Sequence, residues 1–263
     1  MMKGRRLFWG SALLLLGVLL LLENLGLLPF SAWAFFWPLA LIWLGIWLLL
    51  RPRARLEALS RTITIPLGNA REAHLRLDHG AGRLVLHALE DAGTLFLRGE
   101  CGGGVPEVRR EGERLDVRLR LEPDAMLLPW VEGSEGYRWA LAVTPHLPLD
   151  LECHLGANQA HLDLSRLHVR HLILETGASE TTLILPAQGQ GSAHLKSGVA
   201  ALKIQVPPTM AARIHVQSGL AGVNVDAQRF PYAGEVYESP DYATATNRFE
   251  IHVETGLGSV EIS

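Results

Sequence analysis

Apolar and polar residues alternate through most of the chain after residue 55, on both sides of glycines that recur at a fixed interval. Gly156, Gly177, Gly198 and Gly219 begin the segments GANQAHLDL, GASETTLIL, GVAALKIQV and GLAGVNVDA, and successive members are 21 residues apart. Alternation with a period of two is typical of strands that bury one face. The pattern predicts a repeated unit of two strands that meet at a corner glycine.

Two further glycines extend the series. Gly80 begins GAGRLVLHA, and Gly256 begins GLGSVEI 37 residues after Gly219, which is 21 plus an insertion of 16. The positions predicted to be buried lie three and five residues before each glycine and four and six residues after it: Leu75, Leu77, Leu84 and Leu86; Leu151, Cys153, Ala160 and Leu162; Leu172, Leu174, Thr181 and Leu183; Ala193, Leu195, Leu202 and Ile204; Ile214, Val216, Val223 and Val225; Ile251, Val253, Val260 and Ile262.

A unit of 21 residues cannot bury its own apolar face, whereas similar units stacked on one another can. We therefore predict that residues 56–263 form an all-β, single-chain β-solenoid, a parallel β-helix with one 21-residue repeat per rung and rungs about 4.8 Å apart. Each glycine is expected at a corner where the backbone is left-handed or otherwise crowded. The period is lost at about 89–150, which we expect to form the first rungs and a protective cap.

The chain before residue 56 has a different pattern. Residues 7–22 are uncharged, the apolar character resumes after Glu23 and Asn24 up to residue 28, and residues 32–50 form a second uncharged run. A helix of about 20 apolar residues spans the hydrocarbon core of a bilayer. Residues 1–55 are therefore predicted to form a transmembrane helical hairpin, with helices at about 7–28 and 32–50. A cleaved signal peptide is the alternative for the first run, but no small-residue cleavage site follows it.

Basic residues flank the two apolar runs, while the link between them carries only Glu23. These residues are Lys3, Arg5 and Arg6 before the first run and Arg51, Arg53 and Arg55 after the second. Cytoplasmic flanks of membrane helices are enriched in Lys and Arg. The asymmetry predicts a multi-pass protein whose two ends, and with them the C-terminal domain, lie in the cytoplasm.

Overall charge and cysteine content exclude two classes of function. The net charge of −3 provides no basic surface for neutralising phosphates, so nucleic acid is not expected as a partner. The only cysteines, Cys101 and Cys153, are 52 residues apart and have no metal-binding spacing. Two isolated buried thiols are the favoured interpretation, and a single disulfide stays open.

Outward positions of the repeats also align. Four residues before the glycines stand His194, His215 and His252. Stacking would place His194 about 5 Å from His215 with His252 next in line, which suggests a metal site or a pH sensor. We favour a solvated histidine ladder, because a flat row does not converge on one point and no carboxylate is expected alongside. Similarly, Glu175 and Lys196 are expected to form an ordinary cross-strand ion pair.

The 16-residue insertion, RFPYAGEVYESPDYAT at 229–244, contains Tyr232, Tyr237 and Tyr242. Two interpretations stay open: a contact surface for a partner, or a polar lid over the final rung. Cys101 lies in the glycine-rich segment GECGGGVPE, which lacks the Lys-Ser/Thr of a phosphate-binding loop. The residues form no recognisable catalytic, cofactor or metal set, so the chain is predicted not to be an enzyme and to need no cofactor.

Two segments resemble known modules. LFWGSALLLLGVLLLLENLGLLP followed by FFWPLALIWLGIWLLLR resembles the LiaI/LiaF-like transmembrane module, with its Gly-Leu-Leu-Pro turn and Trp-Pro start of the second helix. YRWALAVTPHLPLDLECHLGANQAHLDLSRLHVRHLILETGASETTLILP is similar to the toast-rack domain of LiaF-type and adhesin-type proteins. Together the two modules cover nearly the whole chain.

The resemblance implies a bacterial inner-membrane protein whose solenoid senses or scaffolds a cell-envelope stress response, often by restraining a partner sensor kinase. It transfers no catalytic residues. We therefore expect a non-catalytic regulator that contacts the lipid bilayer and a membrane protein partner. The alternative is a structural or adhesive protein of the envelope that self-associates through the ends or edges of the solenoid.

Overall fold

The computed structural model describes residues 60–121 and 138–263 and, before them, the helical residues Trp37, Leu41 and Ile42. The chain divides into two units, Met1–Arg53 and Ala54–Ser263. Apart from those three residues, the predicted hairpin helices at 7–28 and 32–50 lie outside the described residues. Among the residues that are described, no helix has the length and hydropathy of a membrane span.

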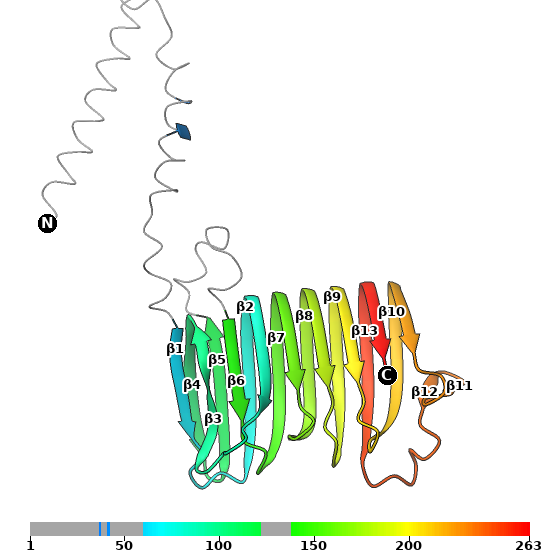
Figure 1. Cartoon of the computed structure of the whole chain (residues 1–263), viewed down its shortest axis with the longest axis horizontal. Coiled ribbons are helices and arrows are strands. Elements are labelled where there is room, and N and C mark those ends of the chain that lie inside the picture. Colours follow the sequence, from blue (N-terminus) through cyan, green and yellow to red (C-terminus); the bar gives the residue numbers. More distant parts are fainter. Residues whose placement is uncertain (1–36, 38–40, 43–59, 122–137) are drawn as a thin grey trace, which may run out of the picture. The chain divides into compact units, whose positions relative to one another are not determined.

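The described part of the second unit consists of strands in a single sheet (Figure 1). Its strands are β1 (Ser60–Pro66), β2 (Glu72–Ala88), β3 (Leu95–Gly102), β4 (Gly104–Glu111), β5 (Arg114–Leu121), β6 (Arg138–Val143), β7 (Pro148–Asp163), β8 (His168–Ile184), β9 (Gln190–Gln205), β10 (Ala211–Val225), β11 (Tyr232–Ala233), β12 (Val236–Glu238) and β13 (Arg248–Ile262). They lie in the order β1-β3-β6-β2-β7-β8-β9-β13-β10-β12-β11, with β5 also pairing with β2 and β4 with β5.

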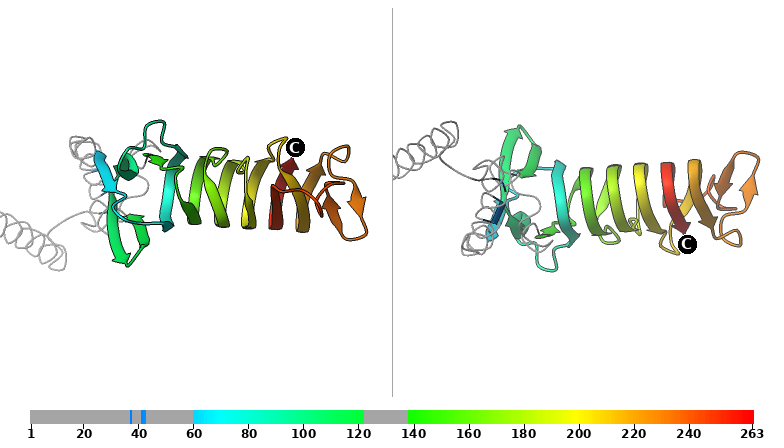
Figure 2. Two further views of the ribbon diagram at one scale, coloured as in Figure 1. Left: turned by 90° about the horizontal axis from the view of Figure 1, so that it is seen from below. Right: turned by 90° about the horizontal axis from the view of Figure 1, so that it is seen from above.

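The repeats pair in parallel and in register. Leu151 of β7 lies opposite Leu172 of β8, which lies opposite Ala193 of β9, so each strand is offset from the last by one 21-residue repeat. Figure 2 shows these long strands side by side along the stack. The glycine does not separate two strands, because pairing continues on both sides of it, at Leu155–Thr176 and at Ala157–Ala178. Each repeat is thus one long strand that passes through its glycine.

The order of the last two rungs differs from the predicted one. β13 lies between β9 and β10, parallel to both, rather than beyond β10. The insertion supplies the length of chain that carries the backbone past β10 and back into the stack. Ser263 then completes the rung, because its carbonyl accepts a hydrogen bond from the Val206 amide at 2.9 Å and its amide donates to Ile204.

The apolar core fills the interior of the stack, as the alternation predicts. All predicted core positions of the rungs β2, β7, β8, β9 and β13 are buried. The exceptions are on β10, where Val216, Val223 and Val225 are only partly buried. This rung is the last long strand of the stack, so one side of its core positions has no further rung to pack against.

Shorter strands cover the other end of the stack. The first half of β2 pairs in parallel with β5 and its second half with β6, so both halves of this terminal rung are covered. β1, β3 and β4 add antiparallel pairs. The buried Trp139 of β6 fixes this region, since its Nε1 donates a hydrogen bond of 3.0 Å to the Gly102 carbonyl. Within the described residues of the irregular part, 89–121 and 138–150, β3, β4, β5 and β6 thus lie at the β2 end of the stack.

The insertion forms a partial lid over the opposite end. β12 pairs with β10 only at Arg213 and Ile214. Phe230 is fully buried and Tyr237 packs against the core, while Tyr232 remains 62% exposed. The lid interpretation therefore accounts for Tyr237, and the exposed Tyr232 keeps a partner contact open.

Candidate functional site

A long groove follows the repeated glycines across the stack and has a volume of about 1140 Å³. Each of the six long strands contributes the same three positions, the glycine and the two residues before it; on β9 these are Lys196, Ser197 and Gly198. Arg118, Arg120 and Leu121 of β5 close one end. The groove is therefore a product of the repeat itself.

Close approach between rungs explains the glycines. A Cβ added at Gly177 would lie 3.0 Å from the carbonyl oxygen of Gly156, and one at Gly256 would lie 2.7 Å from that of Gly198. At Gly156 the Gly80 carbonyl would be closer still. None of these residues has a positive φ; that conformation occurs two residues further on, at Gly82 and Gly258. Of the two expectations for the corner, crowding is confirmed and the left-handed backbone is wrong.

Exposed apolar residues follow the glycines of the last three rungs. Val199 of β9 is 57% exposed, Leu257 of β13 is 46% exposed and Leu220 of β10 is 83% exposed. They are neighbours in register, Val199 with Leu257 and Leu257 with Leu220. The equivalent residues on β7 and β8 are the smaller Ala157 and Ala178. The apolar row is thus widest beside the β10 end of the groove.

The histidine ladder exists, but in a different order. His252 lies between His194 and His215, with ring centroids 4.9 Å and 4.5 Å away and interplanar angles of 6° and 8°. The order differs from the predicted one because β13 lies between β9 and β10. A carboxylate does lie alongside, contrary to expectation: Glu250 Oε1 is 3.5 Å from His215 Nε2 and 3.4 Å from His252 Nε2.

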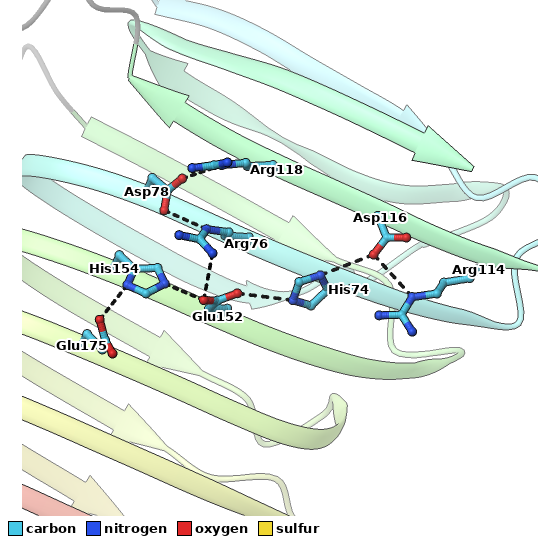
Figure 3. A network of polar contacts seen from close by, with 9 residues as sticks. All are labelled: His74, Arg76, Asp78, Arg114, Asp116, Arg118, Glu152, His154 and Glu175. Atoms are coloured by element: carbon cyan, nitrogen blue, oxygen red, sulfur yellow. Dashed lines mark hydrogen bonds and ion pairs between the residues drawn. The ribbon is translucent and has the colours of Figure 1, made fainter. Parts of the chain in front are cut away.

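The same face carries a continuous polar network at the other end of the stack (Figure 3). Glu152 is its centre, because its carboxylate contacts Arg76 at 3.0 Å, His154 at 2.6 Å and His74 at 3.5 Å. The network continues through Asp78 to Arg118, through His154 to Glu175, and through His74 to Asp116 and Arg114. Each charged group in it faces an opposite charge or an imidazole.

The network sets the ionisation of its two central carboxylates. Burial raises the pKa of Asp78, but hydrogen bonds from Arg118 and Arg76 outweigh it, so the pKa lies below its ordinary value of 3.8. Burial likewise raises the pKa of Glu152, and the contacts with His154, Arg76 and His74 lower it below 4.5 overall. Both carboxylates therefore hold their charge more strongly than free side chains do.

The expected ion pair between Glu175 and Lys196 is replaced by two others. The residues are opposite each other in register, but Glu175 Oε2 accepts from His154 at 2.9 Å and Lys196 Nζ contacts Glu254 at 3.2 Å. Because β13 pairs with β9, Glu254 lies beside Lys196. The repeat alignment places the residues correctly but does not select among neighbouring partners.

Both cysteines are free and buried. Burial raises the pKa of the Cys101 thiol to about 12, and it raises the pKa of Cys153 in the same direction. A thiol reacts as its thiolate. The thiol of Cys101 is therefore protonated and shielded at neutral pH.

Comparisons with known proteins agree with this architecture. Residues 55–205, more than half of the chain, match the family model for the N-terminal domain of toast_rack, DUF2154. Residues 7–49 match the LiaI-LiaF-like transmembrane region, which indicates membrane anchoring. A comparison with curated proteins finds no match.

Two solved structures resemble the chain. A protein of Clostridium sporogenes ATCC 15579, named for a supposed role in cell adhesion, has a TM-score of 0.67 at 18% identity, covering 77% of this chain and 97% of that one. A protein of Bacteroides fragilis NCTC 9343, named as a supposed adhesin, has a TM-score of 0.22 at 10% identity, covering 77% and 96%. The first likeness supports the fold alone. With its repeated parallel rungs and its match over residues 55–205, the chain belongs to the toast-rack family.

Proposed function

We propose that this protein is a membrane-anchored, non-catalytic regulator or scaffold of the cell-envelope stress response, and that it acts by holding a segment of a protein partner in its groove. The observation that carries the proposal is the groove across six in-register strands. Six rungs at about 4.8 Å extend over about 24 Å, which matches about seven residues of an extended chain.

The lining of the groove suits a peptide. Each rung presents a charged or polar side chain two positions before the glycine, such as Lys196, Glu254 and Gln217. One position before the glycine, the hydroxyl groups of Ser197 on β9 and Thr255 on β13 hydrogen-bond each other at 2.9 Å. On β10 the exposed Ser218 occupies this position, and its hydroxyl group can hydrogen-bond a peptide backbone. At the β10 end of the groove, the exposed Leu220 directly follows Gly219, which lines the groove. Mixed polar and apolar contacts are typical of transient protein interfaces.

The match to the transmembrane region supports the membrane anchor. The basic flanks favour a two-pass hairpin with the solenoid in the cytoplasm of a bacterial cell, where the cytoplasmic part of a sensor kinase is accessible. A membrane-impermeant thiol reagent applied to intact cells that carry a cysteine at Lys203 tests this arrangement. Labelling is expected only after lysis, and labelling of intact cells would contradict the cytoplasmic location.

Affinity isolation of the full-length chain from native membranes tests the partner. Lys196 and Lys203 form a matched pair, since both are exposed, both lie on β9 and each contacts a glutamate of β13, but only Lys196 lines the groove. We expect the wild type and Lys203→Trp to recover the same membrane signalling protein and Lys196→Trp to lose it. Recovery of no such protein by the wild type, or equal recovery by all three, would contradict the proposal.

A second candidate function, self-assembly, is favoured by a separate observation. From His215 to Val225, β10 pairs with β13 on one side and, in the described part of the chain, with no strand on the other. Open strand edges template pairing with another chain, here a second copy. Gly222→Pro would block the edge, and light scattering of the full-length protein in detergent is expected to show loss of an oligomer. A monomeric wild type would contradict this candidate.

A further inference from the structure

Three potential metal ligands come together on the outer face at the β10 end of the stack. His215 of β10 and His252 of β13 are directly opposite each other in register. Glu250 lies two residues before His252 on the same strand, and therefore on the same face. One ligand atom from each of the three residues lies within 4.8 Å of the others.

The distances within this cluster fit a shared ion better than direct hydrogen bonds. Glu250 Oε1 lies 3.4 Å from His252 Nε2 and 3.5 Å from His215 Nε2, whereas N–H···O hydrogen bonds are about 2.7–3.2 Å long. Zn²⁺ binds nitrogen and oxygen ligands at about 2.0–2.2 Å in a tetrahedron, which puts any two ligand atoms about 3.4 Å apart. Both separations from Glu250 Oε1 are close to this value.

His215 Nε2 is also unsatisfied. It is shielded from solvent and, within the part of the chain that the structure describes, makes no hydrogen bond. A buried polar nitrogen without a partner is unfavourable. A metal ion between the imidazole and the Glu250 carboxylate would satisfy it.

The Glu250 carboxylate is available because the arginine opposite it in register is engaged elsewhere. Arg213 is opposite Glu250 in register, but its guanidinium donates to Glu238 of β12 and stacks on the ring of Tyr242, 4.4 Å from the centroid. The lid thus holds this cation against a second carboxylate. Glu250 itself contacts only the two imidazoles among the ion pairs of the described residues.

From this geometry we propose that His215, Glu250 and His252 form a surface site for a divalent transition metal such as Zn²⁺. Two imidazoles and one carboxylate suit this class of ion, whereas Ca²⁺ and Mg²⁺ prefer oxygen ligands. Three protein ligands leave a fourth tetrahedral position for water or for a ligand from a partner. The two rings are stacked, so binding requires them to tilt toward each other, which their partly exposed positions allow.

His194 provides the matched control. It stacks on His252 at 4.9 Å and occupies the equivalent position on β9, but it is not one of the three clustered ligands. Titration of the full-length protein in detergent with Co²⁺, read by its visible absorption and by competition with Zn²⁺, measures binding. We expect one ion per chain in the wild type and in His194→Ala, and affinity reduced by more than about tenfold in His252→Ala and Glu250→Gln.

Glu250→Gln preserves size and shape, so it separates loss of a ligand from loss of fold, which far-ultraviolet circular dichroism checks in each variant. Absence of Co²⁺ absorption in the wild type would overturn the site. An equal loss of affinity in His194→Ala and His252→Ala would overturn the assignment of ligands. Neither result bears on the groove, because none of the three residues lines it.

Discussion

The outer face that carries the polar network at one end of the stack and the histidine ladder at the other has the same backbone geometry at both ends. The two ends differ in how their charged groups are paired. At the β2–β7 end, the single carboxylate of Glu152 contacts three basic side chains, Arg76, His74 and His154 (Figure 3). At the β9–β10 end, three imidazoles stack in a row, and one carboxylate, Glu250, contacts two of them. Groups of opposite charge satisfy the first region internally, whereas in the second region His215 Nε2 makes no hydrogen bond within the described residues. The comparison teaches that a ladder becomes a candidate site where its residues lack complementary neighbours.

The two ends of the apolar core also differ, in how completely other strands cover them. Both halves of β2 are covered, by β5 and β6, whereas β12 covers only the start of β10. Leu220 is accordingly among the most exposed apolar residues described. Binding functions are therefore expected at the β10 end and structural stability at the β2 end.

The largest effect is expected from adding a methyl group between the closest rungs. Gly156→Ala would drive a Cβ into the backbone of Gly80, whereas the nearest atom to a Cβ at Gly222 is 4.0 Å away. We expect Gly156→Ala to lower the free energy of unfolding by more than about 3 kcal/mol, and Gly222→Ala to leave it within about 0.5 kcal/mol. Urea denaturation followed by circular dichroism measures both. Similar values for the two variants would contradict the close packing of rungs.

A core truncation compares an internal rung with the terminal one. Val253 and Val216 occupy the same repeat position on β13 and β10 and face each other in register, but Val253 is fully buried and Val216 only partly. Val253→Ala is expected to cost about 2 kcal/mol and Val216→Ala about 1 kcal/mol or less. If β10 rather than β13 were the internal rung, the order of the two values would be reversed.

Removing one carboxylate charge at each end of the stack tests whether the two ends differ in how much their ion pairs stabilise the protein. The Glu152 side chain is 19% exposed with three partners, and that of Glu254 is 54% exposed with Lys196. We expect Glu152→Gln to destabilise the protein by about 1 kcal/mol and Glu254→Gln by less than about 0.5 kcal/mol, again by urea denaturation. Equal costs would remove the distinction between the two regions.

Lowering the pH should reduce the stability that the polar network around Glu152 provides, with a smaller effect than the substitutions above. The pKa values of Asp78 and Glu152 are lowered from 3.8 and 4.5, so their stabilisation is complete above those values and is lost as the pH falls through them and below. Stability of the wild type is expected to fall between about pH 5 and pH 3, and Glu152→Gln should show a shallower fall. An equally steep fall in the variant would show that Glu152 does not contribute.

The repeat could be predicted from the sequence because 21-residue periodicity fixes which positions face inward. The buried Leu172, Leu174 and Leu183 follow directly from the alternation. The order of rungs could not be predicted, because similar repeats present similar edges and any rung can pair with any other. The position of β13 therefore depends on how the insertion folds, which alternation does not encode.

Only part of the candidate metal cluster could be predicted. The sequence aligns His215 and His252, but Glu250 belongs to another column of the repeat, so the alignment of equivalent positions does not place it beside them. Its signal is the spacing of two residues that puts Glu250 on the face of His252. The buried contact between Asn158 and His79 was missed as well, because it joins two different positions of the repeat.

Photo-crosslinking in living cells tests the central claim, that the groove holds a segment of a protein partner. A photoreactive residue is placed in the full-length protein at Lys196 or Gln217, which line the groove, or at Lys203, which does not. The account predicts a crosslinked membrane protein from the two groove positions and none from Lys203. Crosslinks of equal yield from all three positions, or from Lys203 alone, would contradict it.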